Sequence, residues 1–254
     1  MICRIEIPFE SSKRLNYSFY ASSVMQGIIM ENISGNYAEE MHKQALRPYS
    51  QFSACRSGQN IWTISVLSRE AYDNIVIPIL SMKQAEVRHN NDIITFGKPA
   101  VEIMTYQQLL CENSVNSARS DAVELDFTTP TAFKSSGKYV ILPTLRLIFS
   151  SLAKRFDTFF GISNNNYEAL ADEIEENVTI SDYKLSSSSF SLEGVRLPSF
   201  RGSLKIRIKG SGDFRSYIRM LCRFAEFSGV GIKTAIGMGQ IRIKFLLKSG
   251  TSSL

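Results

Sequence analysis

The feature that most limits the possible folds of this sequence is an order of strands and helices that occurs twice. In the first half, Ile2 to Ile7 alternates between apolar and polar residues, as a half-buried strand does. The next segments predict a helix over 24–33, a hairpin over 49–67, a helix over 72–80 and strands between Ile93 and Met104. The first half therefore has the order strand, helix, hairpin, helix, strand.

The second half has a similar order, with one predicted strand where the first half has a hairpin. Ala122 to Phe127 predicts a strand, Leu145 to Phe159 a helix, Leu204 to Lys209 a strand, Phe214 to Ala225 a helix and Gln240 to Leu246 a strand. Both halves fit the βαββαβ unit. We therefore predict an α+β fold of two tandem ferredoxin-like (βαββαβ) domains.

Two polar stretches have no apolar periodicity. Glu112 to Asp121 is the best candidate for an interdomain linker, and it gives predicted domains over residues 1–118 and 119–254. The serine run from Ser186 to Ser189 predicts the tip of a loop.

Charge is unevenly distributed along the chain. The formal net charge is +5, but Arg196 to Lys248 alone carries +10, from twelve basic and two acidic residues. The rest of the chain therefore carries −5. Such an asymmetry fits a polyanionic partner for the C-terminal region, and it also fits a solvated basic face.

A glycine-rich stretch, FSGVGIKTAIGMGQIRI, spans Phe227 to Ile243 within this basic region. It is not a nucleotide-triphosphatase phosphate loop, because Ile232 precedes Lys233 where that motif needs glycine. It is not the dinucleotide fingerprint either, because Thr234 stands where the third glycine belongs. Two interpretations of this stretch remain. It is a loop that binds phosphate through Lys233 and Thr234, or a loop that needs glycine only for tight packing.

Basic residues line the predicted elements around this loop. Arg215, Arg219 and Arg223 recur every four residues on the preceding helix, while one strand face carries Lys205, Arg207 and Lys209. An extended basic surface suits a nucleic-acid backbone better than a single nucleotide. The residues that we predict to bind RNA are Gly229, Gly231, Lys233, Thr234, Gly237, Gly239, Lys205, Arg207, Arg219 and Arg223.

Other site types have little support in the sequence. The four cysteines are far apart and form no CxxC pair, and His42 and His89 are the only histidines. We therefore expect no metal site, no cofactor and no disulfide framework, and a reducing cytoplasm as the location. No stretch approaches the roughly 20 apolar residues that a membrane-spanning helix needs, so we expect no membrane partner.

Three longer stretches resemble one known family. They are RFAEFSGVGIKTAIGMGQIRI (223–243), TTPTAFKSSGKYVILPTLRLIFSSLAKRFD (128–157) and MHKQALRPYSQFS (41–53). They are similar to the CRISPR-associated endoribonucleases of the RAMP superfamily, which cut repeat precursor RNA into guide RNAs. This resemblance implies two facing ferredoxin-like domains and cleavage without metal, which leaves 2′,3′-cyclic phosphate and 5′-hydroxyl ends.

The resemblance also implies where cleavage occurs. His42 stands where the family has its catalytic histidine, and Lys43 or Arg47 could neutralise the phosphorane. Some members complete the proton transfer with a tyrosine at a position that is Met30 here, so Tyr37, or Arg47 alone, is the candidate second group. His89, in the polar segment RHNND, fits a turn that meets solvent or RNA.

The implied partners are CRISPR repeat RNA, the processed guide RNA and other subunits of a CRISPR effector complex, with the protein as a monomer or homodimer. Two other interpretations stay open at this stage. One is a RAMP subunit that binds guide RNA without cutting it. It stays open because Met30 stands where some members have the tyrosine that completes the proton transfer. The other is a generic nucleic-acid-binding protein whose glycine-rich loop serves only packing.

Overall fold

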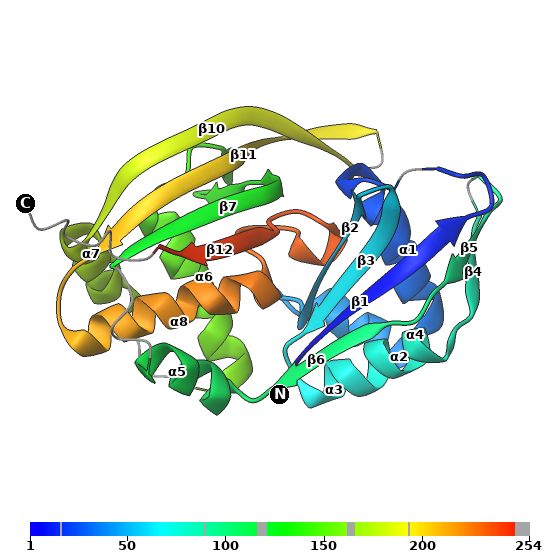
Figure 1. Cartoon of the computed structure of the whole chain (residues 1–254), viewed down its shortest axis with the longest axis horizontal. Coiled ribbons are helices and arrows are strands. Elements are labelled where there is room, and N and C mark those ends of the chain that lie inside the picture. Colours follow the sequence, from blue (N-terminus) through cyan, green and yellow to red (C-terminus); the bar gives the residue numbers. More distant parts are fainter. Residues whose placement is uncertain (16, 89, 116–120, 162–165, 193, 247–254) are drawn as a thin grey trace, which may run out of the picture.

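Two antiparallel sheets lie side by side, and helices cover one face of each (Figure 1). The computed structural model describes all residues except 16, 89, 116–120, 162–165, 193 and 247–254. The side chains of Tyr20, His42 and residues 112–115 also lie outside the described part.

The first sheet has the order β2-β3-β1-β5-β4, with β6 also paired to β1. Its strands are β1 (Ile2–Ser11), β2 (Tyr49–Arg56), β3 (Gln59–Val66), β4 (Gln84–Val87), β5 (Asp92–Phe96) and β6 (Ala100–Met104). The associated helices are η1 (Phe19–Ala21), α1 (Ser22–Asn32), α2 (Gly35–Lys43), α3 (Arg69–Ala71), the π-helical η2 (Tyr72–Val76) and α4 (Ile77–Ser81). This is the βαββαβ order with the β4–β5 hairpin inserted before its last strand.

The second sheet has the order β10-β11-β7-β12. Its strands are β7 (Ala122–Thr131), β10 (Val178–Leu192), β11 (Val195–Ile208) and β12 (Ile241–Phe245), and a separate hairpin is formed by β8 (Phe133–Ser135) and β9 (Lys138–Val140). The helices of this half are α5 (Tyr106–Val115), α6 (Leu145–Phe160), α7 (Tyr167–Asn177), α8 (Gly212–Ser228) and η3 (Thr234–Ile236). Two ferredoxin-like domains are thus confirmed; below, the first and second domain are the units built on the first and second sheet.

The two polar stretches differ from expectation. The predicted loop tip, Ser186 to Ser189, lies inside β10, where its residues pair antiparallel with Pro198 to Arg201 of β11. This prediction was wrong because cross-strand pairing holds residues that have little strand preference of their own. Of the predicted linker, residues 112–115 end helix α5, and 116–120 lie outside the described residues.

Each domain has its own apolar core. Ile5, Ile29 and Trp62 are fully buried in the first. Phe156 of α6 and Phe224 of α8 meet edge to face in the second, with ring centroids 5.2 Å apart. Leu109 of α5 belongs to this second core although it precedes the predicted linker. The division of the chain after residue 118 therefore stays a prediction.

Burial divides the four cysteines into two classes, and this gives a first testable expectation. Cys3 and Cys222 are buried, whereas Cys55 and Cys111 are exposed. Burial, with help from the charge of Glu102, raises the pKa of Cys3 to about 11, and burial also raises the pKa of Cys222. Because only a thiolate attacks a disulfide reagent, these two thiols should be protected at pH 8.

Titration of the native protein with Ellman's reagent at pH 8 should show two fast thiols and two that react only on unfolding. The same titration in guanidinium chloride should release all four at one rate. A native protein in which three or four thiols react in the fast phase would contradict the packing of β1 and α8 described above.

Candidate RNA-binding and cleavage site

The glycine-rich loop between α8 and β12 has no room for side chains at its glycines. Gly229, Gly231, Gly237 and Gly239 all have positive φ, at 67°, 78°, 107° and 73°. A Cβ on Gly231 would lie 2.3 Å from the Ala132 carbonyl oxygen, and one on Gly239 would lie 2.0 Å from that of Val230. Glycine is required at these positions because both the backbone angle and the space exclude any larger residue.

The same loop joins the two domains. A Cβ on Gly237 would lie 2.1 Å from the Cβ of Ser22, the first residue of α1 in the first domain. The Gln51 amide of β2 donates to the carbonyl oxygens of Ser22, at 2.8 Å, and Ala235, at 3.2 Å. Gln51 is itself fixed by the Trp62 indole, which donates to its Oε1 at 2.9 Å. The loop therefore packs against α1 and β2 in a defined position.

A buried arginine supports the loop from the second domain. Arg155 of α6 is 5% exposed, and its guanidinium donates to the Thr234 hydroxyl at 2.9 Å and to the carbonyls of Ser228, at 3.3 Å, and Gly231, at 3.4 Å. Burial lowers the pKa of Arg155 to about 10. Thr234 is 3% exposed. The prediction that Thr234 meets RNA is corrected, because its hydroxyl is enclosed and bonded to Arg155.

Lys233 differs from its neighbours in the loop. Its side chain is exposed, and its backbone has φ +57°, a left-handed conformation that few residues other than glycine adopt. Its carbonyl accepts hydrogen bonds from the amides of Ile236, at 3.1 Å, and Met238, at 3.3 Å, which fix this conformation. The loop thus presents one lysine on a rigid, close-packed backbone.

The basic residues of α8 and β11 fall into two groups. Arg219 is 3% exposed and pairs with Asp121 at 3.1 Å, so its predicted contact with RNA is corrected. Arg223 forms ion pairs with Glu226 and, at 3.2 Å, with Glu102 of β6, which ties α8 to the first domain. In contrast, two basic side chains on β11 point away from the second core: Arg207 is exposed, and Lys205 pairs with Asp182 at 2.8 Å near the surface.

A groove of about 330 Å³ lies between the two sheets. The first sheet contributes Arg4 and Arg56, and β12 contributes Arg242 and Lys244. Two acids, Glu6 and Glu226, also line it, so basic groups outnumber acidic ones. The Arg4 guanidinium lies 4.3 Å from the centre of the Phe227 ring of α8, so one groove residue also contacts the other domain.

The predicted histidine lies in helix α2. Ser34 caps this helix by accepting from the Tyr37 amide at 3.3 Å, and Tyr37 and Met41 fix it to the first core. His42 is its last residue but one, directly after the buried Met41. The His42 side chain and the whole of His89 lie outside the described residues, so their predicted roles stay predictions.

Tyr37 is poorly placed for proton transfer. Its side chain is 5% exposed, and its hydroxyl oxygen is buried without a hydrogen-bond partner among the described residues. Burial raises its pKa, and the charges of Glu70 and Glu40 raise it further. A catalytic role for Tyr37 would need it to leave the core, so we do not include it in the proposed mechanism.

A polar cluster near the end of α2 includes a residue that the sequence analysis missed. Arg47 is half-buried, and Lys43 is exposed. Burial raises the pKa of Tyr49, while a hydrogen bond with Gln26 of α1 and the charge of Arg47 oppose that rise. Gln26 and Arg47 therefore both lie near Tyr49. Gln26 could have been identified from the sequence, because it lies four residues before Met30 and so on the same helix face.

The glycine-rich loop and this polar cluster contact the same helix. Ser22, Gln26 and Met30 are spaced by four residues, so they follow one stripe along α1. Ser22 meets Gly237 of the loop at one end, and Gln26 meets the Tyr49 region one turn later. RNA held by Lys233 and a phosphate near Arg47 would therefore be positioned by one rigid element.

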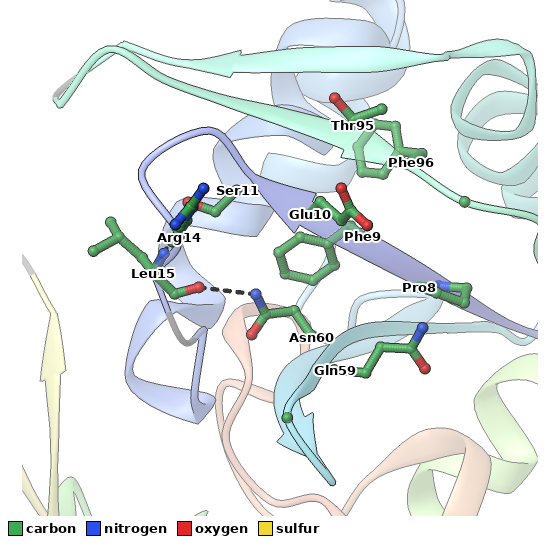
Figure 2. A pocket seen from close by; sticks show the side chains of 12 residues that line it. Pro8, Phe9, Glu10, Ser11, Arg14, Leu15, Gln59, Asn60, Thr95 and Phe96 are labelled. Carbon is green, nitrogen blue, oxygen red and sulfur yellow. Dashed lines mark hydrogen bonds between the residues drawn. The ribbon is translucent and has the colours of Figure 1, made fainter.

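A second, larger cavity, of about 660 Å³, lies at the end of β1, between the β2–β3 turn and β5 (Figure 2). Its Asn60 side chain donates to the Leu15 carbonyl at 2.9 Å and accepts from the Tyr17 amide at 2.8 Å. Nearby, buried Asp92 accepts from the hydroxyls of Tyr17, at 2.6 Å, and Ser11, at 2.7 Å. Because these polar groups hold the segment after β1 in place, we assign them a structural role.

Two other kinds of site have no support in the described part of the chain. Within the described ranges there is no group of three or more His, Cys, Asp or Glu side chains that could hold a metal ion. Among the helices that the structure describes, none is long and apolar enough to cross a lipid bilayer.

Comparison with known proteins agrees with this architecture. A solved Cas6 product complex superposes with a TM-score of 0.77 at 19% sequence identity, covering 96% of this chain and 100% of the other. At that identity the match shows the shared fold.

Sequence comparison shows the family. A model described as CRISPR-associated endoribonuclease Cas6 matches residues 125–241. The CRISPR-associated endoribonuclease Cas6 of Streptococcus thermophilus is 31% identical over 222 residues, which cover 86% of this chain and 89% of that protein. The protein of the same name from Mycobacterium tuberculosis is 33% identical over 229 residues, covering 87% and 70%. This chain therefore belongs to the CRISPR-associated endoribonuclease Cas6 family.

Proposed function

We propose that this protein cuts CRISPR repeat RNA into guide RNAs without a metal ion. In the proposed reaction, the ribose 2′-oxygen upstream of the scissile phosphate forms a bond to phosphorus as the bond to the 5′-oxygen breaks. The products have a 2′,3′-cyclic phosphate and a 5′-hydroxyl. The observation that carries the proposal is the match to Cas6 endoribonucleases over most of the chain.

His42 and Arg47 have the central roles in this proposal. The reaction needs a base that takes the 2′-hydroxyl proton and an acid that gives a proton to the leaving 5′-oxygen. The unperturbed pKa of histidine suits both transfers near neutral pH, so we assign His42 to proton transfer. The Arg47 guanidinium would stabilise the phosphorane, with exposed Lys43 close by in sequence.

The second domain would hold the RNA. Lys233 and Arg207 are exposed, and neither forms an ion pair within the described part of the chain. Lys205 would exchange its surface partner Asp182 for a phosphate. The loop glycines and Arg155 serve this binding indirectly, because they keep the Lys233 backbone in its strained conformation.

The test is cleavage of the repeat RNA encoded beside the gene, in buffer with 5 mM EDTA. We expect the same rate as with magnesium, within about twofold, because the proposed groups all belong to the protein. A 2′-deoxy substitution at the nucleotide upstream of the cut should abolish the product, since it removes the attacking oxygen. Loss of cleavage in EDTA would refute the metal-independent mechanism.

The same experiment distinguishes the alternative function. A non-catalytic subunit would bind the repeat RNA with strong salt dependence and leave it intact. We further propose that the protein acts in the cytoplasm as a monomer or homodimer, with repeat RNA, guide RNA and other effector subunits as partners.

A further inference from the structure

The two domains meet at two edges of the first sheet, and an acidic residue lies at the second of these contacts. Glu102 belongs to β6, and its carboxylate pairs with Arg4 of β1 at 3.8 Å and with Arg223 of α8 at 3.2 Å. The pair with Arg223 crosses from the first domain to the second. We propose that Glu102 is a positioning residue for RNA cleavage, which fixes the angle between the domains and so determines which phosphate reaches His42.

This contact is separate from the one made by the glycine-rich loop. Gln51 of β2 holds the loop through the Ala235 carbonyl. It is in register with Ile64 of β3, Ile5 of β1 and Val101 of β6. The strands β2 and β6 are therefore three strand spacings apart, about 14 Å (Figure 1). Two contacts this far apart keep the domains from turning about either one.

Two arginines from different domains converge on one ring at this contact. The guanidinium groups of Arg4 and Arg223 lie 4.3 and 5.0 Å from the centre of the Phe227 ring. Because both groups are positive, they repel one another across the domain boundary. Glu102 pairs with both, so its carboxylate offsets this repulsion and holds Arg223 next to β6.

The groups that Glu102 connects are fixed within their own domains. Arg4 and Glu102 are direct cross-strand partners on β1 and β6. At the end of α8, the Glu226 carboxylate accepts from the Ile243 amide of β12 at 3.1 Å and pairs with Arg223. The ion pair between Glu102 and Arg223 therefore links the position of one sheet to that of the other.

Glu102 is suited to setting position rather than stability. Its side chain is 41% exposed and that of Arg223 is 25% exposed, and such surface ion pairs contribute little to the free energy of unfolding. Buried groups hold the domains together instead: Phe227 is fully buried, and its carbonyl accepts from the Ser50 hydroxyl of β2 at 2.6 Å. Removal of Glu102 should therefore leave the domains in contact but free to turn slightly about the loop.

A small turn matters because the proposed binding and cleavage groups lie in different domains. Lys233 would hold the RNA from the second domain, while His42 and Arg47 would act on the phosphate from the first. A misplacement of about 1 Å at the reacting atoms can slow a reaction about 10²-fold. This positioning role rests on the proposed function, which supplies the RNA and the catalytic groups.

The first measurement follows the domains directly, in the free protein. Cys55 of β2 and Cys111 of α5 are the two exposed cysteines, and they lie in different domains. Spin labels on these two thiols give the distance between the domains by double electron–electron resonance. In Glu102→Ala the distance distribution should become about twofold broader, because the domains are free to turn. Glu102→Gln keeps an acceptor oxygen and should lie between the alanine variant and the wild type.

The second measurement is single-turnover cleavage of the repeat RNA with protein in excess. Glu102→Ala should cut about tenfold more slowly at the wild-type site and should also produce cuts at neighbouring phosphates. Its affinity for the repeat should stay within about twofold of the wild type, and its melting temperature within about 3 °C. A merely structural role would instead lower the melting temperature and the affinity together with the rate.

Glu31→Ala is the matched control. Glu31 of α1 is 42% exposed and pairs with Arg88 at 3.3 Å, a very similar ion pair that stays within the first domain. This variant should keep the wild-type distance distribution and cleavage pattern. If Glu102→Ala has the same distance distribution as this control, or the same cleavage rate and site, the positioning role is overturned and the proposed function stands. If the wild type does not cut the repeat RNA, both proposals fail.

Discussion

His42→Ala should lower the rate of repeat cleavage by about 10²–10⁴-fold, the range that loss of a general acid–base group produces. Affinity for the repeat should change by less than about threefold, because the residues proposed to bind RNA lie in the second domain. Single-turnover cleavage with enzyme in excess gives the rate, and anisotropy gives the affinity. A variant that cuts at the wild-type rate would remove His42 from the mechanism.

His89→Ala is the matched control, since it removes the only other imidazole of the chain. It should cut within about threefold of the wild type. Arg47→Ala should slow cleavage through loss of phosphorane stabilisation, whereas Arg47→Lys should restore part of the rate because it keeps the charge but not the planar fork. If both arginine variants were equally slow, charge alone would not explain the role of Arg47.

The fold was largely predictable because each half buries one face of its elements. Alternation in β1 and β11 and the helical spacing of α1, α6 and α8 follow from that burial, and all five elements form where the pattern indicated. Strand β5 was predicted, but its partner β4 and helix α7 were not. Their order and pairing depend on contacts with β1 and α6, which no local pattern encodes.

The site was less predictable for a related physical reason. The regular spacing of Arg215, Arg219 and Arg223 shows that they share a helix face, but it does not show what covers that face. The structure covers Arg219 and pairs it with Asp121, which is almost one hundred residues away in the chain. Exposure of a basic residue is a tertiary property, so a basic stripe overestimates the RNA-binding surface.

The role of the glycines also depends on residues that are distant in the sequence. Their number indicated a special backbone, and the two interpretations left open were phosphate binding and tight packing. The atoms that exclude a Cβ belong partly to Ala132 and Ser22, which lie about 100 and 215 residues earlier in the chain. Packing therefore accounts for the glycines, while Lys233 remains the exposed group available for RNA.

Gly237→Ala should destabilise the protein by about 3–5 kcal/mol. The positive φ of 107° costs a side-chain-bearing residue about 1–3 kcal/mol, and overlap with the Ser22 Cβ at 2.1 Å adds a similar amount. For a chain of this length the melting temperature should fall by about 10 °C. Because the strained contact joins the two domains, RNA cleavage should be lost at a correspondingly lower temperature.

Gly58→Ala is the control for the backbone angle alone. Gly58 has φ +80° in the β2–β3 turn, but no atom outside its immediate chain neighbours lies within 4 Å of the position that a Cβ would take. It should cost only about 1–2 kcal/mol. The difference between the two variants measures the steric overlap at the domain interface.

Ser22→Gly should rescue Gly237→Ala in part, because it removes the two closest atoms and leaves the Ser22 Cα at 3.5 Å. Alone, Ser22→Gly loses the hydroxyl that accepts from the Ser53 amide at 3.0 Å, so it should be destabilising by about 1 kcal/mol. In thermal or urea unfolding, the double variant should therefore lose at least about 1 kcal/mol less unfolding free energy than the two single variants lose together. Additive effects would mean that the loop relaxes away from α1, and that Gly237 is needed for its backbone angle alone.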